Sequence, residues 1–152
     1  MKAPQGLLIW LMLAVSCAAQ EDHSAALQKR ADEAKGVQCA RLSMQAARQV
    51  LEEANHYFGE GIIQAARNSV DRSVYYARRS VDCTLQTRKG EKTTEIEIRA
   101  MIRRMNDILR TLDSDDRPPM NKSIAVLEEQ RDRVLRAMFG AAAGKATSEK
   151  KP

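Results

Sequence analysis

Three cysteines are the residues of this 152-residue chain that are best suited to covalent chemistry. Cys39 and Cys83 lie on either side of a glycine-containing stretch, and the midpoint between their positions falls on Gly61. In an antiparallel helical hairpin, residues equidistant from the turn lie opposite each other. If Gly61 marks such a turn, the spacing predicts a Cys39–Cys83 disulfide. The alternative is two separate cysteines buried in an apolar core.

Residues 1–19 predict a signal peptide, which would deliver these cysteines to an oxidising compartment. Lys2 supplies the positive start, residues 7–15 are apolar, and small residues close the segment. The apolar run is shorter than the ~20 residues that a membrane-spanning helix needs. We therefore expect an exported protein that is periplasmic or secreted.

Two processing routes stay open for this leader. Cleavage after Ala19 would release a chain that begins at Gln20. Alternatively, residues 13–17 resemble a bacterial lipobox, in which Cys17 becomes the lipidated first residue. Ala14 stands where the strongest lipoboxes carry leucine, so this match is incomplete. The second route would anchor the protein to the envelope through a lipid on Cys17.

The residues that could bind a metal or a haem are few and poorly spaced. His23 and His56 are far apart, and neither has a cysteine or a second histidine at ligand spacing. Met101 and Met105 lie one helical turn apart and offer two thioethers suited to Cu(I), but both fall on an apolar seam. We therefore expect no metal and no cofactor, and a haem- or copper-binding helical bundle is the alternative.

The chain lacks the motifs that usually identify an enzyme. It contains no CxxC, HExxH or GxSxG pattern and no glycine-rich loop for phosphate. Its carboxylates are placed for helix caps and i,i+4 pairs, and no spacing brings two of them together across a cleft. We therefore predict no catalytic residue and no enzymatic activity.

Two long helices are predicted to position the cysteines. The first covers residues 22–58, with Gly36 as a point where it bends or splits, and the second ends at Lys89 and Gly90. Apolar residues recur every three or four positions in both, as in helices that pack against each other. The two seams are Val37, Ala40, Met44, Ala47, Leu51, Ala54 and Phe58, and Ile63, Ala66, Val70, Val74, Ala77, Val81 and Leu85.

Two further helices are predicted in the second half of the chain. A capping box formed by Thr94 and Glu97 would start the third, whose apolar seam ends at Leu112. A polar loop over residues 113–119 ends in two prolines, and Gly140 would cap a fourth helix over residues 120–139.

These elements predict an all-α fold, an antiparallel helical bundle made of a long α-hairpin and two further helices. We divide the chain into a signal peptide (1–19), a helical bundle domain (20–140) and a disordered basic tail (141–152). The formal net charge is only +5, and charges of both signs are interspersed along the helices. This balance suits an anionic envelope surface better than nucleic acid.

One basic helix carries a candidate partner-binding surface. The adjacent Tyr75 and Tyr76 lie within a predicted helix that arginines such as Arg72 and Arg79 make basic. Arginine and tyrosine are enriched among the residues that dominate protein interfaces. The alternative is a solvated helix face with one tyrosine partly buried.

Residues 57–66, YFGEGIIQAA, resemble the turn of tetratricopeptide-type helical hairpins. The hairpin of residues 37–88 is also similar to uncharacterised Ala/Arg/Glu-rich proteins of the bacterial envelope and periplasm. The resemblance covers one hairpin, and no second copy follows at a spacing of ~34 residues. It implies a scaffold for protein contacts and gives no site residues.

Together these observations predict an exported, non-enzymatic scaffold or interaction protein of the bacterial envelope or periplasm. Its expected partner is a protein of unknown identity, and nucleic acid is not expected. The alternatives are the haem- or copper-binding bundle and a periplasmic chaperone-like protein. The oligomeric state is left open.

Overall fold

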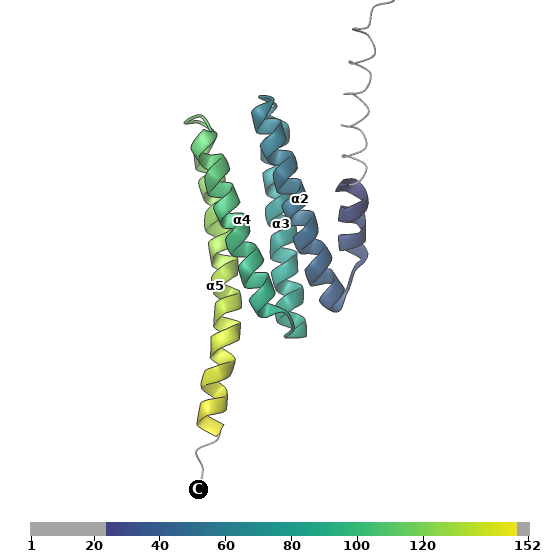
Figure 1. Ribbon diagram of the computed structural model, residues 1–152, viewed down its shortest axis with the longest axis vertical. Coiled ribbons are helices and arrows are strands. Elements are labelled where there is room, and N and C mark those ends of the chain that lie inside the picture. The colour runs from purple at the N-terminus through teal and green to yellow at the C-terminus, as the bar shows by residue number, and fades with distance from the viewer. Residues whose placement is uncertain (1–23, 149–152) are drawn as a thin grey trace, which may run out of the picture.

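The computed structural model describes residues 24–148, with side chains described as far as Gly140. The protein is an all-α bundle, and no strand occurs in this part of the chain. The predicted signal peptide, residues 1–19 with Cys17, lies outside the described residues. A helical segment over residues 24–33 precedes the helices α2 (Gly36–Gly59), α3 (Ile63–Thr87), α4 (Glu91–Thr111) and α5 (Arg117–Ser148) (Figure 1).

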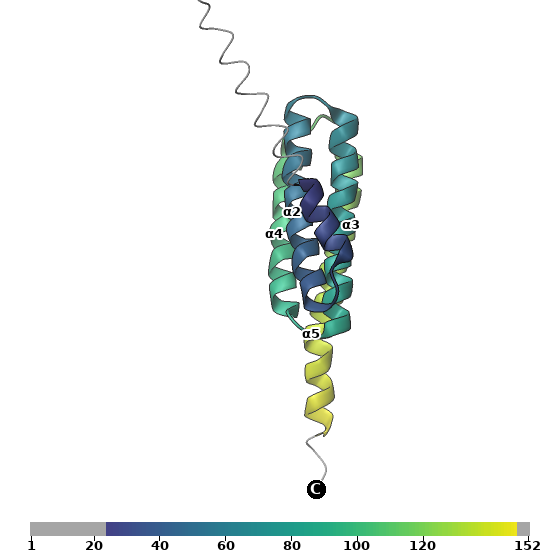
Figure 2. The ribbon, with the colours of Figure 1, turned by 90° about the vertical axis from the view of Figure 1, so that its right-hand side faces the viewer.

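The elements form three layers. Helix α2 packs chiefly against α3, and α4 packs chiefly against α5 (Figure 1). Figure 2 shows the segment 24–33 lying across the outer face of the α2–α3 pair. Short turns connect antiparallel neighbours, as the predicted bundle requires. The prediction of an all-α antiparallel bundle is confirmed.

Small polar residues line the contact between α2 and α3. Ser73 and Ser80 of α3 are buried, and each donates a 2.8 Å hydrogen bond to an α2 carbonyl oxygen, on Ala47 and Ala40 respectively. Small side chains let two helices approach closely, and the carbonyl acceptors satisfy the buried hydroxyls. The alanine seam of α2 was predicted from its spacing, whereas the serines of α3 were not.

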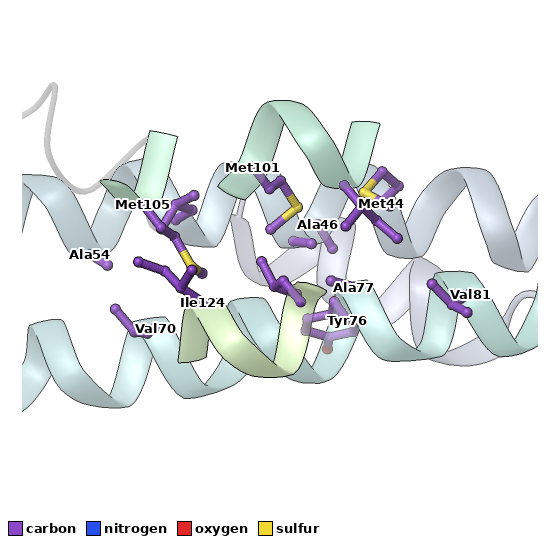
Figure 3. Packing of buried hydrophobic residues seen from close by; sticks show 14 of the residues in the cluster. Met44, Ala46, Ala54, Val70, Tyr76, Ala77, Val81, Met101, Met105 and Ile124 are labelled. Atoms are coloured by element: carbon purple, nitrogen blue, oxygen red, sulfur yellow. The ribbon is translucent and has the colours of Figure 1, made fainter. Parts of the chain in front are cut away.

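Larger apolar side chains fill the space between the α2–α3 and α4–α5 layers. Met101 and Met105 of α4 are 2% and 0% exposed, and they lie with Ile124 of α5 against α2 and α3 (Figure 3). All five residues of the seam predicted for the third helix are buried: Ile98, Met101, Met105, Ile108 and Leu112. The core predicted from apolar spacing is therefore confirmed for α4.

The break at Gly36 is also confirmed. Residues 34 and 35 are not helical, and Gly36 has a φ of +60°, which glycine adopts more easily than other residues. The first predicted helix is therefore two helices. The chain reverses here, so that residues 24–33 lie back on the hairpin.

Three predicted helix boundaries are wrong. Helix α4 begins at Glu91 after a left-handed Gly90, so Thr94 is no cap; it is buried, with its hydroxyl 2.8 Å from that of Thr84. Helix α5 begins at Arg117, because the first-turn N–H groups of a helix have no intrahelical acceptor and prolines are tolerated there. It continues past Gly140, the predicted cap, because a single glycine costs a helix only about 1 kcal/mol. Residues 141–148 of the predicted disordered tail therefore belong to α5, and residues 149–152 lie outside the described residues.

Cys39 and Cys83 lie at disulfide distance, as their symmetric positions predict. Their Cα atoms are 6.0 Å apart, and the bond joins residues separated by 44 positions. Cys39 is near the start of α2 and Cys83 is near the end of α3. The disulfide therefore closes the hairpin at the end opposite its glycine turn.

We expect the disulfide to stabilise the hairpin by restricting the unfolded chain. Replacing both cysteines in a Cys39→Ala, Cys83→Ala variant should lower the free energy of unfolding by about 2–4 kcal/mol. Urea denaturation with and without reductant measures this effect. The double variant is the control, because reductant should not change its stability. Equal stability of the oxidised and reduced wild-type protein would contradict the prediction.

Candidate partner-binding site

The four residues predicted to bind a partner all belong to α3, but only one of them is largely exposed. Tyr75 is 54% exposed, and its ring stands edge-on to that of Tyr76, with 5.1 Å between the centroids. Arg72, Tyr76 and Arg79 contact other elements of the same chain. Part of the predicted binding surface is therefore occupied by contacts within the chain itself.

Tyr76 is buried, with 5% of its surface exposed. Its hydroxyl donates a 3.2 Å hydrogen bond to Oδ2 of Asp32, in the segment 24–33. Burial, and then the charge of Asp32 and this hydrogen bond, together raise the pKa of Tyr76 to about 12. Tyr76 therefore acts as a support for the segment 24–33.

Arg79 binds the same residue of that segment. Its Nη2 donates a 2.9 Å hydrogen bond to the backbone oxygen of Asp32. Its Nε is buried and finds no hydrogen-bond acceptor among the described residues. We call the contacts of Tyr76 and Arg79 with Asp32 the Asp32 clamp. The clamp and the buried Ala31 hold the segment on the α2–α3 hairpin.

Arg72 connects α3 to α2. Its Nη2 lies 3.0 Å from Oε2 of Glu53 and 3.0 Å from Oγ of Ser69. Both contacts are internal, so a partner that recruited this guanidinium would have to compete with Glu53. Of the predicted residues, Tyr75 is the one that a partner reaches without breaking a contact.

A groove of about 780 Å³ lies beside Tyr75, between the hinge at residues 34–36 and the outer face of α3. Its lining includes both cysteines of the disulfide, Tyr75 and three cationic side chains, those of Lys35, Arg78 and Arg79. We call it the disulfide groove. The structure brings Tyr75 and Arg79 together here, and it places Arg72 outside this lining.

Lys35 and Arg78 belong to this site but were not among the residues predicted for it. Arg78 lies within the same basic run, and its adjacency to Arg79 is a signal that could have found it. Lys35 and Asp32 have no such signal. They reach α3 only because the chain reverses at residues 34–36.

Ion pairs neutralise many of the arginines that make α3 and α4 basic. Arg104 binds Glu52 of α2 through two hydrogen bonds of 2.8 and 2.6 Å, and Arg67 binds Asp116 through two of 2.9 and 2.6 Å. Arg131 of α5 pairs at 2.8 Å with Glu95, which is 7% exposed. Such pairs hold the helices in register but leave little charge for a ligand.

The cations of the disulfide groove are different. Lys35, Arg78 and Arg79 form no ion pair with any carboxylate in the part of the chain that the structure describes. Their positive charge is therefore available to a ligand, next to an exposed aromatic ring.

The candidate metal ligands lie apart from this groove. Met101 and Met105 are packed in the core, and His56 is 3.2 Å from Oε1 of Glu60, in the turn after α2. Over the described residues, no three or more His, Cys, Asp or Glu side chains gather into a group that could hold a metal ion. His23 lies outside those residues.

The chain matches no protein-family model, and the curated proteins and solved structures give no match either. The resemblance of residues 37–88 to tetratricopeptide-type hairpins and to envelope proteins therefore stays a prediction. Among the described helices, none has the length and apolar character needed to cross a bilayer.

The raised pKa of Tyr76 predicts a loss of stability at high pH. The folded protein favours the neutral phenol, so this stabilisation is complete below pH 10.0 and is lost as pH rises towards 12. We expect a loss of about 2 kcal/mol in the free energy of unfolding. A Tyr76→Phe variant should lack this component of the pH dependence. Urea denaturation across the range measures both proteins, and identical profiles would refute the assignment.

Proposed function

We propose that this protein is an exported, non-enzymatic interaction protein of the bacterial envelope or periplasm, which binds a partner protein at the disulfide groove. The observation that carries the proposal is the exposed Tyr75 beside cations that have no carboxylate partner among the described residues. Exposed aromatic and arginine side chains at the centre of a concave surface are typical of the residues that dominate protein binding.

Export is supported by two independent features. Residues 1–19 have the pattern of a signal peptide. Cys39 and Cys83, which follow that leader, are placed as a disulfide pair, and such bonds persist chiefly in oxidising compartments. The two features concern different parts of the chain, and each points to the same location.

The rigidity of the disulfide groove supports a scaffold role. The disulfide and the Asp32 clamp fix the two walls of the groove before any partner arrives. A surface that is already ordered loses less conformational entropy on binding. The bundle therefore serves as a rigid support for one recognition surface, without chemistry of its own.

Mass spectrometry of the mature protein from producing cells tests export. We expect a first residue near Gln20, or a lipidated Cys17, and no free thiol on Cys39 or Cys83. Either processing route is compatible with the proposal. An intact leader with two free thiols would exclude it.

Photo-crosslinking in the same cells tests partner binding. A photoreactive residue in place of Tyr75 should give a covalent adduct with another protein. The matched control is the same residue in place of Arg103, an exposed position on α4 that makes no ion pair among the described residues. Adducts at neither position, or equally at both, would argue against a partner site at the groove.

A further inference from the structure

We infer that the disulfide groove binds an acidic peptide segment of the partner protein. The side-chain carboxylates of that peptide would contact Arg78, Arg79 and Lys35. This inference rests on the proposed function and adds the chemical class of the ligand. Three observations support it: the charges of the groove, the buried Nε of Arg79 that has no acceptor among the described residues, and the shape of the groove.

The charges of the groove favour an anion. Three cations line it, and its two carboxylates are Asp71 and Asp82. Asp82 is already paired, because Nη2 of Arg133 of α5 lies 2.9 Å from its Oδ1. Among the lining residues only Asp71 is left to oppose Lys35, Arg78 and Arg79, while the Asp32 carboxylate, which accepts the Tyr76 hydrogen bond, lies outside this lining. The groove therefore carries a net positive charge that the folded chain does not neutralise.

Arg79 contains a donor that the fold leaves without an acceptor. Its Nη2 is engaged by the Asp32 carbonyl oxygen, and its buried Nε has no acceptor among the described residues. Buried polar groups are nearly always hydrogen-bonded, so such an atom calls for an explanation. Because that Nε is closed to solvent, a ligand carboxylate would bind the accessible part of the same guanidinium, whose hydrogen-bonding capacity the fold satisfies only in part.

The remaining lining favours a peptide over a membrane surface. The groove is concave, and its volume of about 780 Å³ is many times that of one carboxylate group. Tyr75 offers an exposed ring, and Val74 is half-buried beside it, so apolar side chains between the carboxylates also find a surface. A flat array of lipid headgroups would reach the cations but would leave this apolar floor uncovered.

Fluorescence anisotropy with synthetic peptides tests the inference on the full mature protein. The probe is a labelled peptide of Glu, Ser and Leu, and its matched control carries Gln in place of every Glu. We expect the acidic peptide to bind and the Gln peptide to bind at least ~10-fold more weakly. Raising the salt concentration should weaken the binding of the acidic peptide.

Charge reversals locate the binding site. Arg78→Glu and Lys35→Glu should each weaken binding of the acidic peptide by about 10-fold, because each replaces an attraction by a repulsion. Arg103→Glu on α4 is the control, since it makes the same change in net charge away from the groove. Both groove residues are exposed, so their replacement should leave the circular dichroism spectrum unchanged.

Each other outcome overturns the inference. Equal weakening by Arg103→Glu would mean that only the net charge of the protein matters. Binding to vesicles of anionic phospholipid, without binding to the peptide, would make the ligand a membrane surface. If neither peptide binds while a crosslinked partner forms at Tyr75, the ligand class is wrong and the proposed function stands. If the crosslink also fails, the proposed function fails with it.

Discussion

The close packing of α2 on α3 is the constraint on which the rest of the structure depends. Alanines on one helix and serines on the other let the backbones approach, and Ser73 and Ser80 bond directly to α2 carbonyl oxygens. Such an interface buries little apolar area per residue, so it gains from a covalent link. The disulfide supplies that link at the end of the hairpin farthest from its turn. Every other element packs on a surface of this pair.

The two outer layers are held by different forces. The α4–α5 layer packs through large apolar side chains such as Met105, and ion pairs such as Arg104–Glu52 connect it to α2. The segment 24–33 on the opposite face depends on the buried Ala31 and on the Asp32 clamp. The first layer therefore secures the fold, whereas the second shapes one wall of the groove.

The sequence was sufficient for features that depend on local spacing. The α4 seam follows from helical periodicity, and the Cys39–Cys83 pair follows from hairpin symmetry about Gly61. The site depends instead on contacts between residues far apart in the chain. Tyr76 is buried because residues 34–36 turn back and bring Asp32 to it, 44 positions away. Gly36 predicts a break in the helix but not where the segment before it packs, so helical periodicity does not separate the exposed Tyr75 from its buried neighbour.

Arg79 belongs to two structures at once, because it holds the segment 24–33 and also lines the disulfide groove. One guanidinium nitrogen holds the backbone of Asp32, and another, on the same rigid plane, makes no hydrogen bond among the described residues. Whatever immobilises the second nitrogen also immobilises the first. By thermodynamic reciprocity, binding of a ligand in the groove and docking of the segment 24–33 on the hairpin then increase each other's equilibrium constant by the same factor. Hydrogen exchange in the segment 24–33 would thus report whether the groove is occupied, because its amide hydrogens should exchange more slowly when a ligand is bound.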